Sequence, residues 1–148
     1  MIIFENQTNI IINNDVLIFL EKIKNSICKN DVELIIVDNN KIKELNKTYL
    51  NKDYATDVLS FPLNYKDIKL DSSEMILGSI VISIDKAIEI QDKFKHPLKY
   101  ELAILFTHAL LHLLGYDHET DNGEHRQKES LILKKFGIKN SLIDRSLI

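Results

Sequence analysis

The alternation of short β-branched runs with longer segments of helical periodicity constrains the fold of this chain more than any other feature. Four runs have the composition of strands, and the run VELIIV has the character of a buried one. The expected strands are residues 2–5, 32–37, 57–63 and 76–84. Pro62 ends the third strand or lies next to its end. The polar residues 64–75 that follow are expected to form a loop.

Five segments between and after these runs carry apolar residues at helical spacing. The expected helices are residues 16–27 after Asn13 and Asn14, 38–49, 85–94, 97–114 and 121–136. Asp38 is expected to cap the second helix. Asp121, followed three residues later by Glu124, is expected to cap the last. The inner face of the second helix is expected to hold Ile42, Leu45 and Tyr49.

This order of elements predicts an α+β fold, with a small mixed sheet of about four strands packed against about five helices. The chain has 148 residues, 45% of them apolar, so it can bury a core of ordinary size. It shows no repeats and no low-complexity linker, and it contains only four glycines and two prolines. Residues 1–148 are therefore expected to form a single domain.

Charge and cysteine content limit the classes of function. A net charge of −3 and a pI near 5.9 argue against a general electrostatic binder of nucleic acid, although a local basic patch is compatible with them. The single cysteine excludes an intrachain disulfide and fits a reducing compartment. No run approaches the roughly 18 apolar residues of a membrane span, and no signal peptide is recognised. We expect a cytoplasmic protein without membrane contact.

The segment 107–118, THALLHLLGYDH, carries the chemistry. His108 and His112 lie four residues apart on the expected long helix, so they project from one face with Cβ atoms about 5–6 Å apart. Both rings can then reach one ion with Zn–N bonds of about 2.0–2.1 Å. Gly115 lets the chain turn back, which brings His118 toward the same ion. Three nitrogen ligands leave a position open to water, as in catalytic rather than structural zinc sites.

The alternative for each histidine is a hydrogen-bonded core residue. Three histidines within eleven residues, with a glycine between the second and the third, favour a metal site instead. The sequence therefore predicts one Zn²⁺ per chain at the end of the long helix, with His108, His112 and His118 as ligands. His96 and His125 lie outside this spacing and are expected to be exposed, although His125 could lie at the edge of the cleft.

The residue after the first histidine separates two classes of hydrolase. The same histidine spacing occurs in a long zinc-protease motif, in which a glutamate follows the first histidine and acts as the general base. Here that residue is Ala109. Its identity argues against peptide hydrolysis by that mechanism.

Three segments resemble the YbeY family of bacterial endoribonucleases. They are HALLHLLGYDH at 108–118, TDVLSFP at 56–62 and LGSIVI at 77–82, in the order of the family. The match is firm from about residue 45 to residue 122. The resemblance implies a single-strand-specific, metal-dependent endoribonuclease that acts in maturation of the 3′ end of small-subunit ribosomal RNA and in ribosome quality control. It also implies ribosomal RNA and the small subunit as partners, and a cleft with zinc at one end. A monomer is favoured.

The chain departs from the family pattern at three positions. Leu50 stands where the family usually has an arginine, a residue that would contact phosphate or stabilise charge. Lys52 or Lys47 could supply the charge, although neither matches the position. Ser79 stands where many members have aspartate. Ala109 replaces a glycine, a change that a helix tolerates.

Four further residues are candidates for the site. Asp117 precedes the third histidine and could orient a ligand or relay a proton, or it could simply bond the backbone of its turn. Thr56, Ser60 and Lys52 could line the cleft. As polar residues on or near a strand they could equally face solvent.

Three functions remain open from the sequence. The first is hydrolysis of RNA phosphodiesters, with either water or a ribose 2′-hydroxyl as the nucleophile. The second is metal-dependent hydrolysis of a peptide or small amide. The third is a ribosome-associated factor in which the metal is structural.

Overall fold

A computed structural model describes residues 1–63 and 76–143, and the expected loop 64–75 lies outside them. The described strands form one mixed sheet in the order β1-β2-β4-β3. They are β1 (Ile2–Asn6), β2 (Asp31–Val37), β3 (Val58–Pro62) and β4 (Ile76–Ser83). β1, β2 and β4 run parallel, and β3 pairs antiparallel with β4. The predicted mixed sheet is confirmed.

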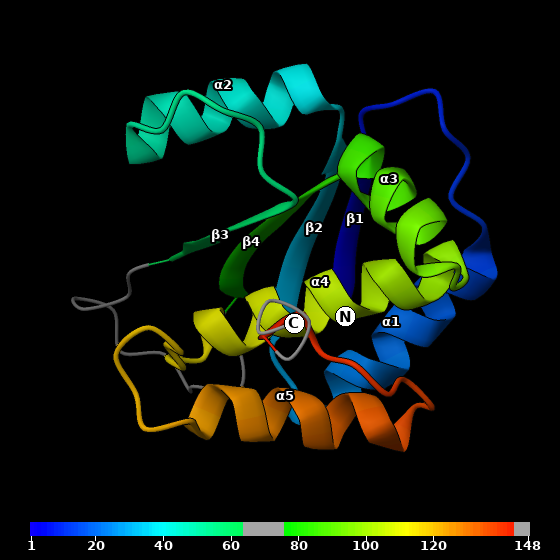
Figure 1. The fold of residues 1–148 in the computed structure, drawn as a ribbon, viewed down its shortest axis with the longest axis vertical. Helices are drawn as coiled ribbons and strands as arrows, with labels where there is room; N and C mark the ends of the chain where they lie inside the picture. Colours follow the sequence, from blue (N-terminus) through cyan, green and yellow to red (C-terminus); the bar gives the residue numbers. More distant parts are fainter. Residues whose placement is uncertain (64–75, 144–148) are drawn as a thin grey trace.

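Five helices surround this sheet in the part of the chain that the structure describes. They are α1 (Asn14–Ile27), α2 (Asn39–Leu50), α3 (Ile84–Phe94), α4 (Leu98–Leu113) and α5 (Glu124–Lys135). Figure 1 shows α2 on one side of the sheet and α4 on the other, with α4 lying between the sheet and α5. The predicted α+β class, with about four strands and five helices, is therefore confirmed. None of these helices is long and apolar enough to cross a bilayer.

The central strands contain the continuous apolar runs 34–37 and 80–82 because both faces of the sheet are covered there. Leu34 of β2 and Ile80 of β4 pack into the larger core with α1 and α4. Val37 and Val81, on the opposite face, pack with Ile42 of α2. Successive side chains of a strand point to opposite faces, so a strand covered on both faces reads as a continuous apolar run.

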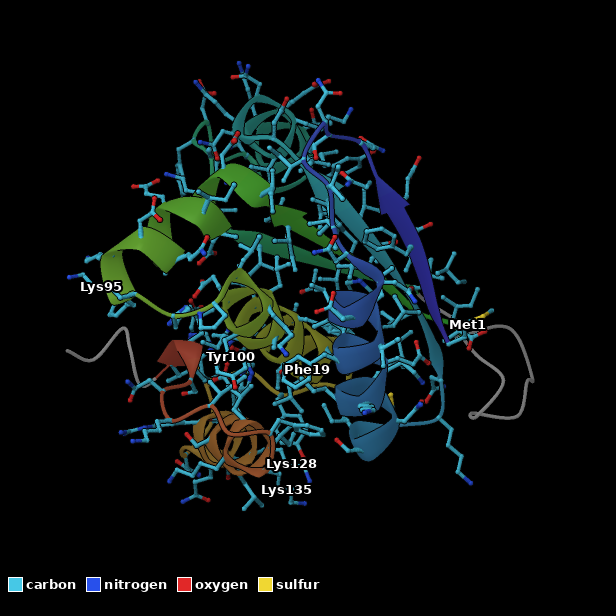
Figure 2. The ribbon with its side chains drawn as sticks, turned by 90° about the vertical axis from the view of Figure 1, so that its right-hand side faces the viewer. Met1, Phe19, Lys95, Tyr100, Lys128 and Lys135 are labelled. Atoms are coloured by element: carbon cyan, nitrogen blue, oxygen red, sulfur yellow. The ribbon has the colours of Figure 1, made fainter. Side chains whose placement is uncertain are left out.

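α4 runs through the middle of the molecule. Every residue from Glu101 to Leu111 is buried, as expected for a helix that is apolar on all sides. Near its beginning, the ring centroid of Tyr100 lies 6.0 Å from that of Phe19 on α1 (Figure 2). The Phe19 ring also meets that of Phe136, after α5, with centroids 5.9 Å apart. Packing on several sides fixes the position of α4, and so of any functional side chain at its other end.

Two caps were predicted, and one of them is formed differently. Asp38 caps α2 as expected, its side chain accepting the backbone N–H of Lys41 at 2.8 Å. The N-cap of α5 is Gly123 at φ 103°, not Asp121. Asp121 accepts the N–H groups of Gly123 and His125 at 2.8 and 2.9 Å. A glycine with positive φ starts the helix two residues later, and the carboxylate reaches its free amides from outside.

The expected inward position of Tyr49 is wrong. Ile42 is buried, but Tyr49 is 66% exposed. Its ring meets Phe61 edge-on at 5.5 Å. Phe61 belongs to β3, the edge strand, so the last turn of α2 has only the rim of the sheet beneath it. Helical periodicity gives the direction of a side chain but not how far the neighbouring sheet extends.

Candidate metal centre

The end of α4 positions the predicted histidines. His108 and His112 occupy its last two turns, and the chain then reverses at Gly115, whose φ is 102°. The N–H of Gly115 donates to the His112 carbonyl and the N–H of Tyr116 to that of Leu111, both at 3.0 Å. This pair of bonds is the Schellman pattern that ends a helix with a left-handed residue. It directs the following loop, with His118, back toward the helix.

The three predicted histidines come together as expected. Their ring centroids lie 4.7 Å apart for His108 and His112, 5.1 Å for His108 and His118, and 5.5 Å for His112 and His118. His108 is buried, His112 half-buried and His118 exposed. The cluster therefore extends from the core to the surface.

The expectation that His125 is exposed is wrong. Its exposed fraction is 0%, and its ring stacks on that of His108 at 4.6 Å with an interplanar angle of 23°. One ring nitrogen from each of His108, His112, His118 and His125 lies within 4.8 Å of the others. His125 is buried because α5 packs against α4 with this side of its first turn inward.

His96 is also less exposed than predicted. Its side chain is 22% exposed, and its Nε2 lies 2.9 Å from Oε1 of the buried Glu101. The ring stacks on that of Phe94. His96 thus pairs with a residue in the first turn of α4, and it is not part of the histidine cluster.

Glu129 forms a hydrogen bond with the ring of His108, and it was not predicted from the sequence. Its Oε1 lies 3.2 Å from Nδ1 of His108, and its side chain has 0% exposure. A carboxylate accepts from Nδ1–H, so Nε2 of His108 keeps its lone pair for another partner. A signal was present, since Glu129 follows His125 by four residues and shares the spacing of the buried Ile132 and Leu133.

Burial favours the neutral form of His108, His112 and His125. The pKa of His108 is lowered to about 4, first by burial and then by the nearby His118, while the Asp57 carboxylate acts in the opposite direction. Burial also lowers the pKa of His125 to about 4, aided by the three other rings and opposed by the backbone of His108. The pKa of His112 is lowered mainly by burial. Neutral imidazoles are the form that binds metal.

The donor set fits a divalent transition metal. Imidazole nitrogens suit zinc, and the His108–Glu129 pair is the carboxylate–histidine arrangement that usually supports a metal ligand. Both ring nitrogens of His125 are buried, and neither makes a well-formed hydrogen bond within residues 1–63 and 76–143, although the backbone of His108 lies close to the ring. Nitrogens on one tetrahedral zinc are about 3.3 Å apart, given Zn–N bonds of about 2.0–2.1 Å. A spread of at most 4.8 Å is therefore closed by movements of about 1 Å.

A polar cleft of about 280 Å³ opens beside the cluster. His108 and His112 contribute to its wall, together with Ala109 from the same helix. The predicted cleft residues Thr56, Ser60 and Lys52 line it as well. The segment 56–60 therefore faces the histidines across the cleft, and the TDVLSFP and histidine segments belong to one site. The catalytic and binding roles of these residues stay predictions.

The positions that bear on the departures from the family pattern have distinct environments. Leu50 lines the cleft and is 47% exposed. Lys52 lines the same cleft, whereas Lys47 lies 3.9 Å from Asp53 and faces that carboxylate. Ser79 is on the other side of the sheet, where its hydroxyl donates to Glu33 at 2.7 Å. Of the two lysines considered as substitutes, Lys52 is the one beside the cleft.

Two aspartates lie near the histidines. Asp117 accepts the N–H of Glu119 at 3.1 Å, which is the turn geometry considered as its alternative, and its charge partly opposes the lowering of the His112 pKa by burial. Asp57 lines the cleft and acts electrostatically on His108. Its Oδ1 accepts the N–H of Val58 at 2.8 Å. Asp57 belonged to the recognised TDVLSFP segment, but nothing in its spacing pointed to the histidines.

Comparison with known proteins identifies the family. The family model for endoribonuclease YbeY matches residues 4–137. Endoribonuclease YbeY of Aliarcobacter butzleri is 49% identical over 99% of both chains, and that of Nautilia profundicola is 53% identical over 86% of this chain and 87% of its own. A solution structure from Thermotoga maritima, 28% identical, superposes with a TM-score of 0.61 over 91% of this chain and 88% of its own. The chain therefore belongs to the endoribonuclease YbeY family.

Proposed function

We propose that this chain is a zinc-dependent endoribonuclease that cleaves single-stranded RNA. We place its action in maturation of the 3′ end of small-subunit ribosomal RNA and in ribosome quality control, in the cytoplasm, as a monomeric single domain. Membership of the family supports the activity. The observation that carries the proposal is that two of the clustered histidines, His108 and His112, open onto a polar cleft edged by a lysine.

The proposed ligands of one zinc ion per chain are His108, His112 and His118. When bound, such an ion polarises a phosphoryl oxygen and lowers the pKa of nearby water. The half-buried His112 and exposed His118 leave one side of the cluster open to the cleft and to solvent. Glu129 fixes the tautomer of His108, and the Schellman turn at Gly115 fixes the approach of His118.

The cleft walls are proposed to bind the RNA strand. Lys52 supplies a positive charge for a phosphate, and the hydroxyls of Thr56 and Ser60 supply hydrogen bonds. An open cleft favours a single strand over a duplex, because a flexible strand can place one phosphate beside the histidines. Leu50 offers this site an apolar contact in place of the family's usual charge.

Two carboxylates are proposed to handle the proton of the attacking oxygen. Asp57 faces the cleft beside His108, so it is better placed to accept a proton. Asp117 acts on His112 electrostatically but does not line the cleft, and each aspartate accepts one backbone N–H of its own segment. We therefore expect Asp57→Asn to lower kcat more than Asp117→Asn does.

The rival function is a ribosome-associated factor with a structural metal, and the buried position of His125 favours it. A site closed by four protein ligands is typical of structural zinc. Hydrolysis of a peptide is less favoured, because Ala109 lines the cleft where the related proteases carry their glutamate.

The test uses zinc-loaded protein, a chelated sample and the His112→Ala variant. Each is incubated with a single-stranded RNA, with the same RNA in a duplex, and with casein. We expect cleavage of the single strand by the zinc-loaded protein alone. Products with a 2′,3′-cyclic phosphate would identify the ribose hydroxyl as nucleophile. Equal cleavage by the His112→Ala variant, or digestion of casein only, would refute the proposed function.

A further inference from the structure

We propose that His125 is a fourth nitrogen ligand of the ion held by His108, His112 and His118. This inference rests on the proposed function only in requiring that the histidine cluster binds a metal. It changes the coordination from three protein nitrogens to four, and it adds α5 to the elements that build the site.

The environment of the His125 ring supports coordination. The residue has 0% exposure, and neither ring nitrogen makes a well-formed hydrogen bond in the described part of the chain, although the backbone of His108 lies close enough to raise the pKa of the ring. Buried polar groups are nearly always paired, and one backbone group can serve only one of the two nitrogens, so at least one of them calls for a partner that the described protein atoms do not supply. The ring lies 4.7 Å from that of His112 and 5.3 Å from that of His118. An ion among these rings provides that partner.

The backbone holds His125 in this position. Asp121 accepts the N–H of His125 at 2.9 Å and fixes the first turn of α5. One turn later Glu129 meets His108 at 3.2 Å. Residues four apart share one face of a helix, so a single face of α5 carries both a nitrogen donor and the carboxylate that orients a second ligand.

The four histidines differ in how rigidly the fold positions them. His108 and His112 lie on α4 and His125 on α5, whereas the exposed His118 lies on the loop after Gly115. Three nitrogens thus come from two helices packed against each other. Because a loop moves more easily than packed helices, a substrate group entering the coordination sphere would displace His118 rather than His125.

The first experiment counts ligands in the wild-type protein. X-ray absorption spectroscopy of the zinc-loaded chain measures the number of imidazoles on the ion. Four imidazoles are expected. A count of three imidazoles overturns the proposal and leaves the proposed function intact. Because the experiment uses the wild-type protein, the result does not depend on a variant that folds.

The second experiment removes the nitrogen. His125→Leu fills the same buried space with an apolar side chain, and His96→Gln is the matched control, a histidine outside the cluster replaced by a side chain that can still bond Glu101. The variant is expected to keep one equivalent of Zn²⁺, to bind it at least tenfold more weakly, and to show a changed visible spectrum with Co²⁺. Affinity and spectrum equal to those of the control would overturn the proposal.

RNA cleavage separates this inference from the proposed function. Four imidazoles on the zinc of a protein that cleaves no RNA would support the ligand and refute the enzyme. Three imidazoles on the zinc of a protein that cleaves RNA would support the enzyme and refute His125 as a ligand.

Discussion

Replacing Glu129 by glutamine is expected to weaken zinc binding while leaving the fold intact. The carboxylate accepts a hydrogen bond from Nδ1 of His108 at 3.2 Å, and both side chains are buried, so the bond is little screened by water. Glutamine has the same shape but no charge, and its amide can donate to Nδ1 instead. That reversed bond would place the proton of His108 on Nε2, the nitrogen proposed to bind the metal.

The size of the effect follows from the role of such partners. Loss of a group that supports a ligand typically costs about 10–100-fold in metal affinity, or about 1.4–2.7 kcal/mol. The assay is competition for Zn²⁺ against a chromogenic chelator at neutral pH. Circular dichroism of the chelated proteins verifies that the variant is folded before the metal is added.

Glu124→Gln provides the control, because it removes a carboxylate from the same helix without touching a histidine. Glu124 is exposed, and its carboxylate accepts only the N–H of Asn122 in the described contacts. If Glu129→Gln and Glu124→Gln bind zinc within twofold of each other, the reasoning about tautomer and charge is wrong. The His108–Glu129 pair would then serve packing alone.

Three further predictions concern pH and RNA binding. His108 and His125 have a pKa of about 4 in the folded chain against an ordinary value of 6.5, so the unfolded state binds more protons between these limits. Their contribution to the free energy of unfolding is complete above pH 6.5 and is lost as the pH falls to about 4, by roughly 3 kcal/mol for His108 alone. Urea melts of metal-free protein should show this loss. An equal loss in a His108→Leu variant would contradict the assignment to His108. Lys52→Ala should weaken binding of single-stranded RNA and reduce the slope of log K against log salt by about 0.7, and an unchanged slope would exclude a phosphate contact. Leu50→Arg, at an exposed position of the cleft, should tighten RNA binding by roughly fivefold, or about 1 kcal/mol. Fluorescence anisotropy measures this affinity. No gain in affinity at low salt would show that the family's charge is not needed here.

Local patterns explain why the elements and half of the site could be predicted. Strand and helix periodicities depend on neighbours two to four residues away, and they placed all nine described elements within a few residues. The same local rule put His108 and His112 on one helical face, and Gly115 predicted the reversal that brings His118 to them. These three residues lie within one helix and its adjoining turn, so no long-range packing was needed to foresee their meeting.

The other half of the site depends on how distant elements pack. A helical pattern shows that His125 and Glu129 share a face of α5, but whether that face meets water or α4 is decided by the path of the chain between the two helices. The same holds for Thr56, Ser60 and Lys52, which face the histidines only because β3 and the segment before it lie beside α4. Sequence alone therefore determined that His108, His112 and His118 come together within the segment 108–118. Tertiary structure decided which residues share one buried, low-dielectric space, because burial is set by the packing of segments that are far apart in sequence.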